Sequence, residues 1–303
     1  MAKAINLHKI KKHIEAKISD SEKIKQNQII AQRSKLATFL ERVPEGTKEP
    51  PAKGWIYTGI EGFDILLKKG VPKGSSNLIC GGPGSGKTIF GLQTLYYGAT
   101  RGEKCIYMSF EESEERLRQH MRDFGWDPEP LEKKGRLLIK RFDPFEVTRQ
   151  VEAMLEKSKG ELLIDVKPLV FPKGFTNPDR IVVDSASAIA AAFVGREDSY
   201  RAYIEHLFRL FEEIGSTSFL ISETGQIPTS LTRSGVEEFL ADGVILLYNI
   251  KRGNFRESAI EILKMRGADF KRQIVAMQII SGKGIVVYPE QEVFGKVEGP
   301  YGA

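Results

Sequence analysis

The chain has 303 residues, of which 41% are hydrophobic, 28% charged and 9% aromatic. This is the composition of an ordinary globular protein, and it excludes collagen-like and disordered chains. Residues 1–54 hold 12 basic and 6 acidic residues, whereas the remainder is nearly neutral. The net charge of +5 therefore indicates a basic arm on a neutral body and argues against a protein that coats nucleic acid with its whole surface.

Several other classes of protein are not expected. Cys80 and Cys105 lie in apolar strand-like runs without a CxxC motif, so we expect two buried thiols and no disulfide framework. The four histidines show no metal-ligand spacing, so we expect no zinc site. The N-terminal residues lack a continuous apolar stretch, and no run is long enough to cross a membrane. We therefore expect a cytoplasmic protein with no signal peptide and no membrane contact.

The first 54 residues are expected to form a separate arm and a linker. Apolar residues at three- and four-residue spacing, beginning at Leu7 and Ile10, predict a basic helical arm over residues 1–42. Three prolines and two glycines in residues 43–54 predict an extended linker. The arm is interpreted either as a docking helix or as a partly disordered segment.

From residue 55 to about 290, strand-like and helix-like segments alternate. This alternation predicts an α/β domain with a mostly parallel central sheet. Continuous apolar runs mark the parallel strands, namely residues 76–80, 105–110, 137–140, 180–184, 218–222 and 244–248. Three later segments predict a C-terminal antiparallel β extension, namely residues 258–265, 274–280 and 284–288. Prolines predict an irregular insertion at 162–179, and residues 291–303 would form a tail.

Residues 81–88 read GGPGSGKT, which matches the P-loop pattern GxxxxGK[ST] between an apolar strand and a helical segment. Glycines let successive N–H groups point at a phosphate, and the helix that follows adds its positive end. Lys87 would reach the β- and γ-phosphates of ATP, and the Thr88 hydroxyl would bind Mg²⁺. The alternative is a glycine-rich turn without a ligand. The expected nucleotide-binding residues are Gly82, Pro83, Gly84, Ser85, Gly86, Lys87, Thr88 and Ile89.

Asp184 ends the apolar run RIVVD, where a Walker B carboxylate would stand and hold Mg²⁺ through a water molecule beside Thr88. The alternative is an aspartate that caps the next helix, a role for which Ser185 and Ser187 are also available.

Two acids follow the strand that comes after the P-loop helix. Glu111 and Glu112 stand at the end of that strand, where a carboxylate would orient or deprotonate the water that attacks the γ-phosphate. We expect both to be catalytic, with Glu112 the stronger candidate. The alternative is an acidic helix N-terminus favoured by the helix dipole, which suits Glu114 and Glu115 well.

With these residues in place, the chain resembles the KaiC family of RecA-like P-loop ATPases from about residue 56 to 289. The resemblance extends over residues 58–75, 124–139, 235–247 and 260–270 and joins FEE, GVEEF and LKMRG in one chain. It implies a RecA-like core in a ring, typically a homohexamer, with ATP between adjacent subunits.

The resemblance also implies a role for Lys264 and Arg266 in LKMRG, which would reach the neighbouring subunit's γ-phosphate as a finger that stabilises transition-state charge. The alternative is a pair of solvated cations. Glu223 stands at the strand end where RecA-like proteins sense the γ-phosphate.

The chain also departs from the best-known members of the family, which carry two ATPase domains in tandem. Glu238 and Phe239 stand where the tandem clock protein autophosphorylates, so the autokinase and clock roles are not expected here.

These observations predict a ring-forming, Mg²⁺-dependent ATPase that regulates a protein partner. A DNA repair or recombination accessory is the alternative, motivated by the basic arm. A third hypothesis is a non-catalytic interaction protein that docks through residues 1–42.

Overall fold

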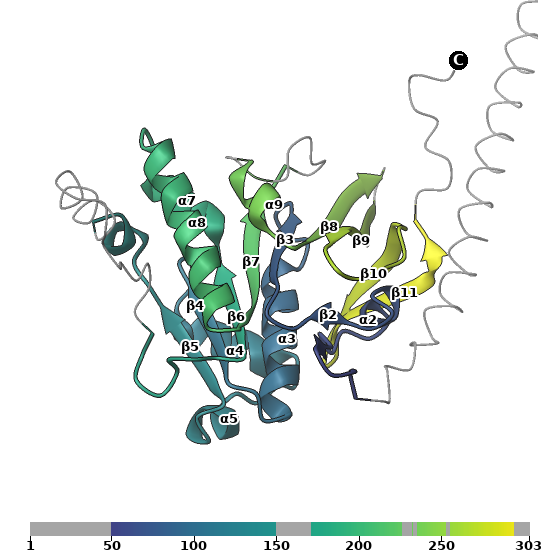
Figure 1. The fold of residues 1–303 in the computed structure, drawn as a ribbon. Coiled ribbons are helices and arrows are strands. Elements are labelled where there is room, and N and C mark those ends of the chain that lie inside the picture. Colours follow the sequence, from purple (N-terminus) through teal and green to yellow (C-terminus); the bar gives the residue numbers. More distant parts are fainter. Residues whose placement is uncertain (1–49, 150–170, 226–231, 233–234, 253–254, 294–303) are drawn as a thin grey trace, which may run out of the picture. The chain divides into compact units, whose positions relative to one another are not determined.

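The computed structural model of the chain describes residues 50–149, 171–225, 232, 235–252 and 255–293 (Figure 1). Residues 1–42, most of the predicted 43–54 linker, residues 162–170 of the predicted insertion and residues 294–303 of the tail lie outside this part of the chain. The predictions made for those segments stay predictions.

A nine-stranded sheet forms the centre of the domain, in the order β11-β10-β9-β8-β3-β7-β6-β4-β5. The six strands from β8 to β5 in this order are parallel, and β9, β10 and β11 extend the sheet antiparallel at one edge. The bounds are β3 (Ser76–Gly81), β4 (Cys105–Ser109), β5 (Leu137–Arg141), β6 (Arg180–Asp184), β7 (Thr217–Glu223), β8 (Gly243–Arg252), β9 (Phe255–Met265), β10 (Val275–Ile280) and β11 (Gly284–Glu292).

The predicted fold class is confirmed, because all six parallel strands and the three-stranded antiparallel extension form where their apolar runs lie. Strands β3, β4 and β6 are buried along their whole length, as expected for parallel strands covered on both faces. The central strand β3 pairs with β7 and β8, both of which come much later in the chain.

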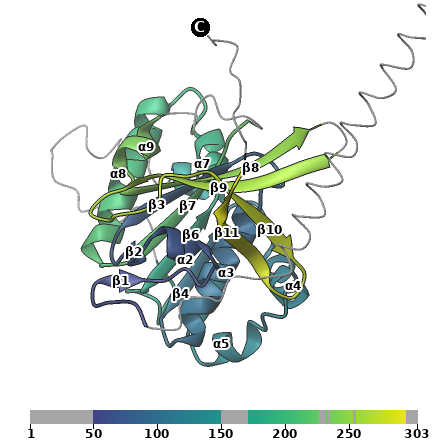
Figure 2. The same cartoon turned by 90° about the vertical axis from the view of Figure 1, so that its right-hand side faces the viewer.

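Helices cover both faces of the sheet (Figure 2). One face packs against α2 (Phe63–Leu66), α3 (Lys87–Thr100), α4 (Glu114–Asp123) and α5 (Glu129–Lys133), and the other against α7 (Ala186–Ala192), α8 (Glu197–Glu213) and α9 (Val236–Leu240). In α8 the buried residues recur every three or four positions from Tyr200 to Phe211, which is the spacing of one helix face. Ser113 begins α4 by accepting a hydrogen bond from the Arg116 N–H.

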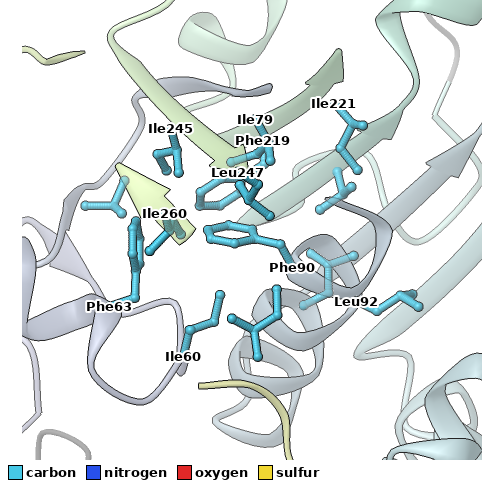
Figure 3. Packing of buried hydrophobic residues seen from close by; sticks show 14 of the residues in the cluster. Ile60, Phe63, Ile79, Phe90, Leu92, Phe219, Ile221, Ile245, Leu247 and Ile260 are labelled. Carbon is cyan, nitrogen blue, oxygen red and sulfur yellow. The ribbon is translucent and has the colours of Figure 1, made fainter. Parts of the chain in front are cut away.

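Phe90 of α3 lies at the centre of the hydrophobic core between the sheet and helices α2 to α5. Its ring packs edge-on against Phe63 of α2 and at a tilted angle against Phe219 of β7 (Figure 3). A small two-stranded sheet, β1 (Trp55–Ile56) with β2 (Val71–Pro72), flanks α2. This core fixes α3, and therefore the loop that precedes it, against the carboxyl end of β3.

Both cysteines are free and buried, as expected, and burial raises the pKa of each thiol. Within the part of the chain that the structure describes, no helix is both long and apolar enough to cross a membrane.

Candidate nucleotide-binding site

The GGPGSGKT segment joins the carboxyl end of β3 to the first residue of α3. Gly84 and Gly86 adopt left-handed φ angles of 72° and 98°, which glycine reaches without strain. A Cβ atom on Gly81 would lie 2.5 Å from Ser85 Oγ and 2.6 Å from the Leu247 carbonyl oxygen, so no side chain fits there. The loop therefore has the tight curvature that turns backbone N–H groups inward.

Ser85 supplies a test of whether a phosphate chain fits this loop. Its hydroxyl is buried and has no hydrogen-bond partner among the described residues, although buried hydroxyls are normally paired. The first N–H groups of α3 are also without partners inside their own helix. A loop that holds a buried unpaired hydroxyl next to a helix N-terminus suits an anionic ligand.

Lys87 lies across the loop. Its ammonium group donates to the carbonyl oxygens of Gly81 at 2.9 Å and Gly82 at 3.1 Å. Burial lowers the pKa of Lys87, while the nearby carboxylates of Glu223, Asp184 and Glu111 raise it. The cation is thus held beside the loop by neutral carbonyl groups, with three acids close by.

Asp184 ends β6 and accepts a hydrogen bond from the Thr88 hydroxyl, 3.0 Å from Oδ2. The buried Tyr107 hydroxyl of β4 donates to the same oxygen. The pKa of Asp184 is raised to about 6, chiefly by burial. Glu111 also raises this pKa, whereas the hydrogen bonds from Tyr107 and Thr88 lower it. The structure therefore brings together two residues, Thr88 and Asp184, that the sequence places 96 positions apart.

The donor set at Thr88 and Asp184 fits Mg²⁺. Both groups offer oxygen, and Mg²⁺ takes oxygen ligands while it keeps several waters, so few protein ligands suffice. No cluster of three or more His, Cys, Asp or Glu residues that would suit another metal occurs in the described part of the chain.

Glu111 lies beside Asp184. The Ser185 hydroxyl donates to Glu111 Oε1 and also accepts from the Ala188 N–H as the N-cap of α7. Ser185, and not Asp184, therefore caps the helix that follows β6. The peptide bond between Asp184 and Ser185 is cis.

Glu112 has different partners. Its Oε2 lies 3.1 Å from His120 Nε2 and 3.0 Å from Arg116 Nε, both on α4. The two adjacent acids thus separate, because Glu111 joins the Asp184 cluster and Glu112 pairs with cations of the following helix. Glu223, at the end of β7, is exposed and is held by a hydrogen bond from its N–H to the Ser187 hydroxyl.

Lys264 and Arg266 lie away from their own P-loop. Lys264 pairs across the sheet with Val244, which is in register with Leu78, three residues before Gly81. That offset is about 10 Å along the strand. The ammonium group of Lys264 donates to the carbonyl oxygens of Glu238, Phe239 and Ala241 at the end of α9.

Arg266 is exposed. One of its guanidinium nitrogens donates to the Phe239 carbonyl oxygen at 3.0 Å, and another lies 3.5 Å from an Asp242 oxygen. Burial, then Arg266, lowers the pKa of Lys264. The two cations therefore share the carboxyl end of α9.

For three residues near the site, no role in holding it was predicted. Tyr107 and Ser185 hold the two acids, and Asn249 of β8 donates to the Gly84 carbonyl oxygen at 3.1 Å. A polar residue inside an apolar strand was the available signal for Tyr107. No signal pointed to Asn249, which lies 165 positions from Gly84.

Comparison with known proteins places most of the described domain in one family. The family model for the KaiC ATPase matches residues 56–292. The circadian clock protein KaiC3 of Synechocystis is 37% identical over 237 residues, which are 77% of this chain and 45% of that protein. A UPF0273 protein of Thermotoga maritima is 33% identical over 243 residues, which are 78% of this chain and 96% of that protein.

The chain thus spans about half the length of the clock proteins that it matches and almost the whole of the UPF0273 protein. Among solved structures, a KaiC-like protein of Pyrococcus horikoshii is similar with a TM-score of 0.63 and 33% identity. The similarity covers 78% of this chain and 99% of that one.

Proposed function

Because the chain belongs to the KaiC family of ATPases, we propose that it binds ATP with Mg²⁺ and hydrolyses the terminal phosphoanhydride bond. The observation that carries this proposal is the convergence of Lys87, Thr88, Asp184 and Glu111 at the carboxyl end of neighbouring parallel strands. Open α/β sheets bind their ligands at this end.

Each residue then has a role in phosphoryl transfer. The loop N–H groups and Lys87 bind and orient the phosphates, and Thr88 with Asp184 would hold Mg²⁺. When bound there, Mg²⁺ would neutralise part of the charge that develops on the transferred phosphoryl group. Glu111 orients the attacking water and accepts its proton, and Ser185 holds the Glu111 carboxylate for this task. Glu112, paired with His120 and Arg116, is the weaker candidate for this role on geometric grounds.

We further propose a ring in which ATP lies between subunits. Lys264 and Arg266 are displaced along the sheet from their own phosphate loop and would serve a neighbour's nucleotide. Arg266 is the better finger, because it is exposed and its carboxylate contact is long at 3.5 Å. The ammonium group of Lys264 already faces three carbonyl oxygens.

The ring would convert its nucleotide state into a signal for a protein partner. The DNA-repair alternative is not favoured, because the matching family and relatives are KaiC ATPases and a UPF0273 protein. The basic arm on which that alternative rested lies outside the described residues.

The test is steady-state ATP hydrolysis by the full chain and by Lys87→Ala, with the mass in solution measured with and without MgATP. We expect Mg²⁺-dependent hydrolysis that Lys87→Ala abolishes, and a mass several times 34.0 kDa with nucleotide. Hydrolysis by Lys87→Ala at the wild-type rate would contradict the assigned site. A monomer that hydrolyses ATP would contradict the ring and leave the loop assignment standing.

A further inference from the structure

Tyr107 places one polar atom inside an apolar layer. It is the third residue of β4, it is fully buried, and it belongs to the core cluster between the sheet and α3. The neighbouring residues Ile106 and Met108 face the core on the other side of the sheet, under α7 and α8, as the alternation of side chains along a strand requires. A phenylalanine would satisfy the packing of this position, so the hydroxyl needs its own explanation.

The opposing helix leaves room for the ring. Gly91 lies in the interior of α3, where glycine costs about 0.5–1 kcal/mol relative to alanine. A Cβ atom on Gly91 would lie 2.9 Å from Val182 Cγ1 and 3.3 Å from Tyr107 Cε2. Glycine at this position therefore lets the helix pack closely over the tyrosine ring.

The hydroxyl reaches the acid of the candidate metal site. It donates to Asp184 Oδ2, the oxygen that also accepts from the Thr88 hydroxyl. Both side-chain hydrogen bonds that Asp184 accepts within the described residues therefore fall on one oxygen. The described residues supply no hydrogen bond to Oδ1, so this oxygen would be available to a water bound to Mg²⁺. Two hydroxyl donors from different elements restrict how far the carboxylate can rotate.

We propose that Tyr107 is a positioning residue for the Mg²⁺ site: its buried hydroxyl fixes the Asp184 carboxylate against Thr88 in the orientation that the metal requires. This inference rests on the proposed function, and it names a residue that acts through Asp184 without touching nucleotide or metal. Groups that orient the ligands of a metal commonly change metal affinity by about 10- to 100-fold when they are removed.

Tyr107→Phe deletes a single oxygen, and Tyr203→Phe is the matched control. Tyr203 is also buried, on α8, and its hydroxyl has no partner in the described structure. Binding of a fluorescent ADP analogue is titrated with Mg²⁺ and repeated in EDTA. We expect Tyr107→Phe to raise the half-saturating Mg²⁺ concentration by about tenfold and to leave binding in EDTA unchanged. Tyr203→Phe should leave both the Mg²⁺ dependence and the binding in EDTA unchanged.

A double variant tests whether the effect passes through Asp184. In an Asp184→Asn background, Tyr107→Phe should produce no further change in the Mg²⁺ dependence. An equal tenfold effect in that background, or a wild-type Mg²⁺ dependence in the single variant, would overturn the role of Tyr107 and leave ATP binding intact. If the wild-type chain bound no nucleotide with Mg²⁺, the proposed function would fail together with this inference.

Discussion

The two ends of strands β3 and β8 hold their charged side chains in different ways. At the carboxyl end, Asp184 and Glu111 are each held by hydroxyl groups, and Lys87 lies near both of them. At the amino end, Lys264 and Arg266 are held mainly by the carbonyl oxygens that end α9. At the carboxyl end three acids lie near one lysine. At the amino end two cations are held mainly by neutral carbonyl groups, with one long contact from Arg266 to Asp242.

A cation held by neutral carbonyl groups keeps its charge available to an anion, because a carbonyl dipole attracts it less than a carboxylate does. Phe239, next to these cations, exposes 79% of its surface. We read the amino end as one half of a site whose other half is the P-loop of another subunit. The following predictions test that reading, from the largest expected effect to the smallest.

Arg266→Ala should lower the turnover of ATP by about 1,000-fold, the scale of an arginine finger. Stability should change little, because the side chain is exposed. The measurement is steady-state hydrolysis, with Arg201→Ala on the surface of α8 as the control. Wild-type turnover in Arg266→Ala would remove this residue from the reaction.

Co-expression of Lys87→Ala with Arg266→Ala sharpens the same prediction. In a ring with head-to-tail interfaces, about a quarter of the interfaces in a random mixture would combine an intact P-loop with an intact finger. We therefore expect partial recovery of hydrolysis. If two inactive variants gave no activity together, the two ends would not share a site.

Glu111→Gln should lower turnover by about 100-fold, the lower end of what a general base contributes. Glu112→Gln should stay close to the wild-type rate, because Glu112 pairs with Arg116 and His120. Nucleotide binding should persist in both variants, which a fluorescent ADP analogue would show. The reverse order of turnover would assign the base to Glu112, as the sequence alone suggested.

Asp64 belongs to neither end and provides a reference for effects on stability alone. Its carboxylate accepts three hydrogen bonds from Thr58 and Gly59, and burial raises its pKa from 3.8 to about 6. Between pH 4 and 6 the folded chain therefore binds a proton that the unfolded chain does not. This group adds stability as the pH falls, by about 1.4 kcal/mol per pH unit.

Urea unfolding of wild type and Asp64→Asn at several pH values measures this contribution. The stability of wild type relative to Asp64→Asn should increase as the pH falls from about 6 towards 4. A difference that is constant across this range would mean that Asp64 does not titrate there.

Lys264→Met should lower the free energy of unfolding by about 1 kcal/mol, because it removes hydrogen bonds to the last carbonyl groups of α9. Its turnover should fall less than that of Arg266→Ala. Lys251→Met, on the exposed part of β8, is the control. A loss of turnover equal to that of Arg266→Ala with no loss of stability would make Lys264 a finger as well.

Much of the carboxyl end was predictable from the sequence. The P-loop, Asp184 and the strands that carry them follow from a motif and from apolar runs, because both signals are local. The sheet edge from β9 to β11 was predictable for the same reason. The RecA-like architecture came from the resemblance, and the order of the strands in the sheet was not predicted.

The partners of these residues were not predictable in the same way. Alternation along β4 indicates which core Tyr107 faces, but its contact with Asp184 depends on the register of β4 against β6 and on the space that Gly91 leaves. The separation of Glu111 from Glu112 depends on where α4 begins. The bonds from Lys264 join strand β9 to the end of a short helix whose carbonyl groups lie 23 to 26 positions earlier in the chain.

The position of β3 also has a consequence for how the chain reaches this structure. The strand that carries the phosphate loop contacts β7 through Ser76 and Ser218, 142 residues apart, and contacts Asp242 across 166 residues. At ribosomal rates these partners emerge on the order of ten seconds after β3. Pairing between segments so far apart is slow. The apolar strand β3 would therefore stay unpaired until β7 and β8 have been synthesised. The phosphate loop would be among the last parts of the domain to gain its native support.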